Sequence, residues 1–178
     1  EYTNEPYAIA KIAGLKMIEN YNIQYKTNYL CLMPCNLYGP NDNYDTNNSH
    51  FLPALIKKID FAKENKLNHI TLWGDGSPKR ELMHVDDLAN SILFFLKKKS
   101  NKYLINVGSG EEYTIHKFAE KIMGLLNYNV DIKLDTSMPN GTMRKLLDSS
   151  YANKQGWKSK ILLNKGLQNT YEDYLNKK

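Results

Sequence analysis

The sequence predicts an α/β fold, because segments with the pattern of buried strands alternate with segments that have the pattern of helices. Residues 29–33 and 103–107 are short, largely apolar runs, as expected of strands buried on both faces in a parallel sheet. A helical pattern precedes each run, and a loop rich in glycine or proline follows it. Open parallel sheets bind ligands in such loops, at the carboxyl ends of their strands.

The composition is that of a soluble globular protein. The chain has 178 residues, of which 42% are hydrophobic and 24% charged, enough for one domain or one and a part. No apolar run approaches the ~20 residues that span a bilayer, and the first residues lack the pattern of a signal peptide. We therefore expect no membrane partner.

The net charge of +5 is compatible with an anionic ligand, but also with lysines spread over solvated faces. Residues 97–99 form the one run of lysines, so we expect no nucleic-acid partner.

Cys31 and Cys35 would lie roughly 13 Å apart on a strand, too far for a disulfide. Reduced thiols favour a cytoplasmic protein. The four histidines lack the spacing of metal ligands, so no metal site is expected.

The first half of the chain begins with a predicted helix from Pro6 to about residue 24, since proline suits the first turn. The strand at 29–33 ends in the breaker-rich segment 34–40, and a polar loop follows at 41–49. Ser49 is expected to cap a helix from about residue 50 to 64. A short strand at 70–73 and a turn at 74–78 come next.

The second half continues the alternation. An extended segment is expected at 80–85, and then Asp86 or Asp87 caps a helix over 88–96. The strand at 103–107 is followed by a helix at 115–126, capped by Thr114. Further elements are a strand near 130–134, a Pro/Gly loop at 138–142, and helices at about 149–155 and 163–176. The sheet begins at what reads as a late strand.

Lys11 lies four positions after Tyr7 on the first predicted helix, so their side chains share one face. A nearby ammonium favours the phenolate, which makes Tyr7 a plausible proton donor and acceptor. The same spacing recurs at Tyr113 and at Tyr174, so it does not identify a site without its surroundings.

Gly108-Ser109-Gly110 lies between a strand and a helix, where a dinucleotide-binding loop could lie. Tyr113 occupies the place of the third glycine of that motif. Glu111 and Glu112 would repel a pyrophosphate at the helix start. We therefore interpret the segment as a tight turn.

Four motifs occur in a characteristic order: Asn4-Glu5-Pro6-Tyr7-x-x-x-Lys11, residues 34–40 (Pro-Cys-Asn-Leu-Tyr-Gly-Pro), residues 80–87 (Arg-Glu-Leu-Met-His-Val-Asp-Asp) and residues 106–110 (Asn-Val-Gly-Ser-Gly). Together they resemble the extended short-chain dehydrogenase/reductase family, whose members act mostly on nucleotide-linked sugars. More specifically, the following residues are similar to the GDP-L-fucose synthase family: 34–43, 48–50, 52–55, 72–74, 141–142 and 144–148. The resemblance covers essentially all 178 residues but only the later part of that family's chain.

The resemblance implies the C-terminal portion of a Rossmann-type parallel sheet plus a smaller mixed α/β substrate-binding domain. Residues 1–40 would end the NADP-binding domain. Residues 41–178 would mainly bind substrate, with about 85–110 returning to the Rossmann sheet. It also implies a homodimer that packs through the tyrosine helix. The family's phosphate loop, catalytic serine and epimerisation cysteine precede that helix, so we expect a fragment that binds NADPH poorly and is inactive alone.

The family converts GDP-4-keto-6-deoxy-D-mannose to GDP-L-fucose by epimerising C3 and C5 and reducing the C4 ketone with NADPH. Carried onto this sequence, Tyr7 protonates the oxygen at C4, Lys11 holds the nicotinamide ribose, and His50 is the acid/base of epimerisation. The implied cofactor contacts are Lys11, Pro34, Cys35, Asn36, Leu37 and His50. The implied contacts to the GDP-sugar are Lys58, Trp73, Arg80 and Asn140.

Two of these positions depart from the family pattern and leave the sugar open. Lys58 replaces an arginine and loses bidentate geometry, and Asn140 replaces an aspartate and loses its charge. A 4-ketoreductase, epimerase or dehydratase of another nucleotide sugar, such as a GDP-heptose, is therefore an alternative. A non-catalytic module that binds sugar nucleotides or a protein partner is another.

Individual residues also have simpler explanations. His50 could be a surface residue at a helix start, Trp73 could belong to the core, and Arg80 could pair with Asp86 or Asp87. The ordered motifs around them favour the functional assignment in each case.

Overall fold

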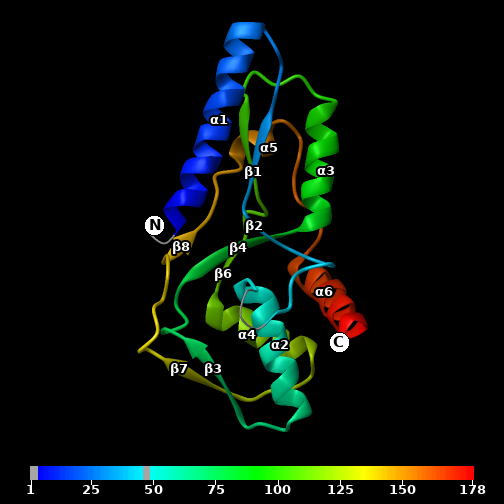
Figure 1. The fold of residues 1–178 in the computed structure, drawn as a ribbon. Coiled ribbons are helices and arrows are strands. Elements are labelled where there is room, and N and C mark those ends of the chain that lie inside the picture. The colour runs from blue at the N-terminus through cyan, green and yellow to red at the C-terminus, as the bar shows by residue number, and fades with distance from the viewer. Residues whose placement is uncertain (1–3, 46–48) are drawn as a thin grey trace.

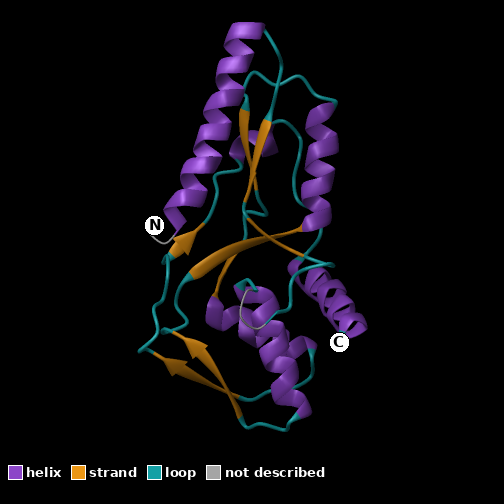
Figure 2. Cartoon of the chain, viewed as in Figure 1, coloured by secondary structure: helices purple, strands orange, loops and turns teal. Residues whose placement is uncertain are grey.

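The computed structural model describes residues 4–45 and 49–178, so Asn48, one of the motif positions, lies outside the described residues. Its elements run along an elongated molecule (Figure 1) and alternate between helix and strand (Figure 2). In chain order they are α1 (Glu5–Tyr25), β1 (Cys31–Pro34), β2 (Asn36–Tyr38), α2 (Phe51–Glu64), β3 (His69–Trp73), β4 (Lys79–His84), α3 (Val85–Leu96), β5 (Leu104–Val107), β6 (Glu112–Thr114), α4 (Ile115–Leu125), β7 (Asp131–Asp135), β8 (Arg144–Lys145), α5 (Ser150–Lys154) and α6 (Leu163–Lys177).

One end of the molecule is built on β1 and β5, which pair in parallel from Cys31↔Leu104 to Pro34↔Val107. The predicted parallel strands are therefore confirmed. α1, α3 and α5 lie around this pair in Figure 1. A small core fills the space beside it, made of Met83, Phe95, Ile105, Val107, Ala152 and Trp157.

The prediction that the first strand is buried on both faces is wrong. Met33 is exposed, and no described residue of α1 is buried. β1 pairs with β5 and with no other strand in the described ranges 4–45 and 49–178. An apolar strand is buried only where a further strand or layer covers it.

The other end of the molecule holds the larger core. It lies between α2, α4 and α6, and its fully buried members include Leu52, Ile59, Phe118, Ile122 and Leu167. β3 and β7 form a second parallel pair, from His69↔Asp131 to Trp73↔Asp135, beyond these helices. Parallel strands packed with helices, as expected of the α/β class, are thus observed at both ends of the molecule.

β4 joins the two ends. It pairs in parallel with β2 and β8 and antiparallel with β6, and it crosses the middle of the molecule in Figure 1. The sequence predicted β4 as extended but did not predict its three partners as strands. Those partners have two or three residues each, which is too short for a periodic pattern, and only their pairing with β4 defines them.

Two helix starts test the predicted caps. Thr114 Oγ1 accepts a hydrogen bond from the backbone N–H of Lys117 at 3.0 Å, so this cap is confirmed. Ser49 is not the cap of α2. The N-cap is His50, which makes no side-chain cap bond, while Ser49 Oγ is buried without a partner in the described part of the chain.

The start of α3 also differs from prediction. His84 is its N-cap, and its Nδ1 accepts from the N–H of Asp86 at 3.2 Å. Asp87 is instead buried inside the molecule and accepts from the N–H groups of Lys160 and Ile161 at 3.0 and 2.9 Å. This acidic residue therefore holds a distant segment rather than its own helix.

Both cysteines are free, as expected from their spacing. Within residues 4–45 and 49–178, no three His, Cys, Asp or Glu side chains come together as a metal would require. No helix in the same ranges is both long and apolar enough to cross a membrane.

Candidate functional site

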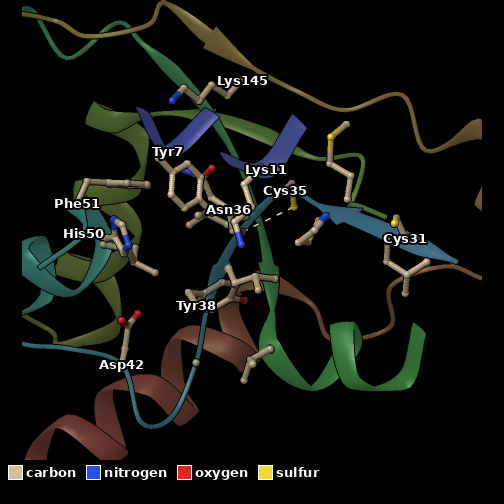
Figure 3. Close-up of a pocket in the computed structure, with 18 of the residues that line it drawn as sticks. Tyr7, Lys11, Cys31, Cys35, Asn36, Tyr38, Asp42, His50, Phe51 and Lys145 are labelled. Carbon is tan, nitrogen blue, oxygen red and sulfur yellow. Dashed lines mark hydrogen bonds between the residues drawn. The ribbon is translucent and has the colours of Figure 1, made fainter. Parts of the chain in front are cut away.

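A hollow of about 1280 Å³ opens between α1, the β1–β2 segment and the start of α2 (Figure 3). Seven of the predicted catalytic and cofactor-binding residues line it: Tyr7, Lys11, Pro34, Cys35, Asn36, Leu37 and His50. These residues come from three separate stretches of the chain. The fold therefore brings together the residues that the motifs had connected only by their order.

Tyr7 and Lys11 lie on successive turns of α1. The Lys11 Nζ is 5.3 Å from the centroid of the Tyr7 ring, so the ammonium lies close to the phenol, as the helical spacing predicted. Tyr7 is 60% exposed, which leaves its hydroxyl accessible to a ligand in the hollow.

The two other tyrosines with the same spacing make local contacts. Tyr113 donates to Glu111 at 3.2 Å, and Tyr174 donates to the buried carboxylate of Asp60 at 3.2 Å. Neither of them lines the hollow. Position relative to the β1–β2 segment, and not spacing, distinguishes Tyr7.

The segment from Pro34 to Leu37 forms the floor of the hollow at the carboxyl end of β1. The N–H of Cys35 donates to Val107 O at 3.1 Å, which fixes the segment against β5. Its thiol donates weakly to Asn36 O at 3.7 Å, drawn as a dashed line in Figure 3. Burial, and secondly the charge of Glu81, raises the pKa of Cys35 to about 12. The thiol stays protonated near neutral pH and is poorly suited to act as a nucleophile.

His50 is an exposed residue directly before α2. Its side chain lines the same hollow as Tyr7, and Figure 3 draws the two rings near one another. Exposure alone would suit a surface residue at a helix start. A position in a hollow shared with Tyr7 and Lys11 supports the functional assignment.

The four predicted substrate residues do not line this hollow. Trp73 ends β3 and is 64% exposed, so it does not belong to the core. Lys58 lies on α2, and its Nζ donates to Thr71 O on β3 at 2.6 Å. Partial burial of that ammonium lowers the pKa of Lys58.

Asn140 and Arg80 are connected through the segment before β8. Asn140 Oδ1 accepts from the N–H of Asp75, two residues after Trp73, at 2.8 Å. Arg80 Nη1 donates to Thr142 O at 2.6 Å. These two bonds therefore hold residues 140–142, and the chain continues from there to Lys145 at the hollow.

Sequence reasoning missed Lys145 as a site residue. It lies on β8, pairs in register with Arg80, and lines the hollow, at whose edge Figure 3 shows it together with Tyr7. It belongs to the segment 144–148 that carries part of the resemblance, but nothing in the sequence indicates that its strand pairs beside Arg80. β4 and β8 thus connect the two groups of predicted residues.

The arrangement is suited to proton transfer next to a bound ligand. It presents a phenol, an ammonium and an imidazole around one hollow, whose volume exceeds the ~300–1000 Å³ of typical small-molecule sites. The residues fit a nicotinamide cofactor: small side chains at Ala10 and Gly14 allow close approach of a ring, and Lys11 can donate to ribose hydroxyls.

Comparison with known proteins identifies the family of this chain. A sequence model of the NAD dependent epimerase/dehydratase family matches residues 1–108. A probable GDP-L-fucose synthase 1 of Oryza sativa subsp. japonica is 46% identical over 175 residues, which are 98% of this chain and 53% of the relative. The GDP-L-fucose synthase of Escherichia coli K12 is 42% identical over 184 residues, covering 98% of this chain and 57% of the relative.

Among solved structures, MlghC, a GDP-mannoheptose C4 reductase from Campylobacter jejuni with NADP bound, superposes with a TM-score of 0.84 at 31% identity. The match covers 98% of this chain and 61% of that one. The chain therefore spans just over half the length of the curated relatives it matches.

Proposed function

Because this chain belongs to the NAD-dependent epimerase/dehydratase family, we propose that it forms part of an NADPH-dependent enzyme that converts GDP-4-keto-6-deoxy-D-mannose to GDP-L-fucose. The observation that carries the proposal is the hollow shared by Tyr7, Lys11, His50 and the loop 34–37. The term full-length protein denotes a chain as long as those relatives.

In the reduction step, Tyr7 donates its proton to the oxygen that forms at C4 of the sugar. Lys11 holds the nicotinamide ribose, and its charge stabilises the phenolate that remains on Tyr7. NADPH, when bound, supplies the hydride. Cys35 and Asn36 would face the nicotinamide half of the cofactor from the floor of the hollow, with Pro34 and Leu37 beside them.

In the epimerisation steps, His50 transfers a proton at the sugar ring. An exposed imidazole can exchange that proton with solvent. Inversion of C3 and C5 also needs a second acid/base on the opposite face of the sugar ring, the role that the resemblance gives to a cysteine preceding the Tyr7 helix. Outside the hollow, Arg80 and Lys58 provide cationic donors for the diphosphate, and Trp73 and Asn140 contact the nucleotide sugar.

We also propose the division of the chain that the motifs suggested. Residues 1–40 end the cofactor-binding domain, and 41–178 mainly bind substrate, with about 85–110 returning to the cofactor-binding sheet. The pairing of β5 with β1 supports that return.

The apolar residues exposed on α1 support a homodimer through this helix, and two free thiols support a cytoplasmic location.

A C4 reductase of another GDP-sugar, such as a GDP-heptose, is the second candidate. The likeness to the C4 reductase MlghC at 31% identity favours it. So do the two departures at Lys58 and Asn140, since both change how the site recognises its sugar nucleotide. The two candidates differ in their sugar and in one chemical step, because only the first exchanges protons at C3 and C5.

The test incubates the full-length protein with GDP-4-keto-6-deoxymannose and NADPH in deuterated water. We expect loss of NADPH absorbance together with deuterium at C3 and C5 of the product. NADPH consumption without deuterium at either carbon would exclude the fucose synthase assignment and favour the reductase.

The variant His50→Gln tests the epimerisation steps separately from cofactor binding. We expect it to abolish deuterium incorporation, while fluorescence titration still detects NADP binding, weakened by at most the contact of His50, because Lys11 and residues 34–37 remain. Incorporation at the wild-type rate in His50→Gln would contradict the assigned role of this residue.

A further inference from the structure

Glu81 is a buried carboxylate that the proposed mechanism does not use. It lies on β4 directly after Arg80 and is 1% exposed. A carboxylate so far from water requires hydrogen-bond donors. Its two oxygens find them in two separate stretches of backbone, at Gly110 and at Leu147.

The first oxygen, Oε1, accepts from the N–H of Gly110 at 2.7 Å. Gly110 has a φ of +77°, a conformation that favours glycine. A Cβ at Gly108 would overlap the Glu81 carboxylate, so this glycine leaves the space that the side chain fills. The N–H of Gly110 in the Gly108-Ser109-Gly110 turn is therefore bonded to a protein carboxylate and is not available to a phosphate.

The second oxygen, Oε2, accepts from the N–H of Leu147 at 2.9 Å. Leu147 follows β8, whose pairing with β4 ends at Lys145. The side chain thus continues the attachment of this segment to β4 beyond the last paired residue. The same segment is held at Thr142 by Arg80 and at Asn140 by the N–H of Asp75.

We propose that Glu81 is a positioning residue that, through its bond to Leu147, holds Lys145 in place at the hollow for the sugar nucleotide. It acts through backbone and does not touch substrate. Its bond to Gly110 holds it from the other side, next to the loop that begins at Val107, whose carbonyl fixes Cys35. This inference rests on the proposed function for its substrate, but the anchoring itself can be measured without one.

Asp87 provides a matched control. It is 2% exposed and also accepts two backbone N–H groups, from Lys160 and Ile161, but on a segment that holds no predicted site residue. Glu81 accepts at both of its oxygens, so Glu81→Gln loses one acceptor, because an amide can accept at only one of its two heteroatoms. Both N–H groups bond the same oxygen of Asp87, Oδ2, and one amide oxygen could still accept both, so the control variant is Asp87→Ala, which removes the acceptor.

The experiment measures both variants in the full-length protein. For Glu81→Gln we expect the KM for GDP-4-keto-6-deoxymannose to rise by about tenfold or more, the effect of losing a bond to a charged acceptor. Asp87→Ala should leave this KM unchanged although it also lowers the melting temperature. An equal KM for the two variants would overturn the proposal, because Glu81 would then act on stability alone.

Hydrogen exchange of the unliganded protein distinguishes failure of this inference from failure of the proposed function. Glu81→Gln should speed exchange at Gly110 or Leu147, and Asp87→Ala should speed exchange at Lys160 and Ile161. If the wild type does not turn over the GDP-sugar, the function is wrong and exchange alone decides. Wild-type exchange rates at both Gly110 and Leu147 in Glu81→Gln would refute the anchoring.

A second variant applies if Glu81→Gln does not fold. Gly108→Ala keeps the charge but displaces the carboxylate, so we expect the same rise in KM and the same faster exchange. If neither variant folds, Glu81 serves the fold as a whole and the positioning role is excluded.

Discussion

At the scale of single residues, the proposed chemistry depends on a few side chains whose neighbours decide their roles. Tyr7 has an ammonium 5.3 Å from its ring and an open hollow in front of it. Tyr113 has the same spacing to a lysine but donates to Glu111 outside the hollow. The difference between them is the surrounding fold and can be tested directly.

Tyr7→Phe in the full-length protein removes the proposed proton donor and little else. We expect kcat for NADPH oxidation to fall roughly a hundredfold or more, while the affinity for NADP persists. Steady-state absorbance and fluorescence titration measure the two quantities. Tyr113→Phe is the control and should retain its rate; equal rates for Tyr7→Phe and the wild type would remove the tyrosine from the mechanism.

The buried thiol of Cys35 makes the stability of the folded protein fall as the pH rises through the alkaline range. Its pKa is about 12 in the fold against an ordinary value of 9.0, so the unfolded chain loses this proton first. The contribution of the buried thiol is complete below about pH 9 and is lost as the pH rises toward 12. We expect the melting temperature of Cys35→Ala to decline less steeply with pH over this range than that of the wild type. Parallel declines would show that the thiol ionises equally in both states.

At the scale of elements, helix starts show how pattern and context compete. Thr114 caps α4 as its sequence position suggests. At α2 and α3 the residue that ends the preceding segment, His50 or His84, becomes the N-cap instead. α1 differs again, because its apolar residues face several directions and none is buried. Local propensity therefore determines that a helix forms, while packing determines where it begins and which face it buries.

Thr114→Ala should destabilise the protein by about 1 kcal/mol, the usual effect of losing a threonine cap. Ser49→Ala is the matched control. Its hydroxyl is buried without a partner among the described residues, so its removal should be neutral or slightly stabilising. Urea unfolding monitored by circular dichroism measures both. An equal loss in the two variants would mean that Ser49 caps α2 in solution.

At the scale of the whole molecule, the two ends differ in how well they are covered. The core between α2, α4 and α6 is closed by buried aromatic and aliphatic side chains. At the other end, Ile9, Ile12 and Met17 of α1 are each more than half exposed. Exposed apolar residues gathered on one element mark a surface that another part of a protein covers. The part of the relatives' length that this chain does not span and a second copy of the chain are both suited to that position.

The 178 residues alone should therefore differ from the full-length protein. We expect the shorter chain to bind the dye ANS through α1, to bind NADPH poorly and to show no turnover. The full-length protein should bind less ANS and be active. A clear reductase rate from the 178 residues would contradict the expectation that the site is completed by residues outside them.

The sequence by itself determined the α/β class, the parallel strands β1 and β5, most helices, and the grouping of Tyr7, Lys11, the 34–37 loop and His50. These follow from local periodicity, from the breakers that end each strand, and from motifs whose order is fixed along the chain. Local chemistry is sufficient for the helices and strands, because each depends on residues close together in the sequence, whereas the grouping of the site residues was predicted from the order of the motifs.

Only the tertiary structure decided the rest. The strands β2, β6 and β8 exist because β4 pairs with them, and Lys145 reaches the hollow because β8 lies in register with Arg80. Asp87 and Glu81 look like a cap and a motif residue in the sequence, yet each holds backbone more than sixty residues away. Long-range pairing leaves no periodic signal in either partner, so it is read from the fold and not from the chain.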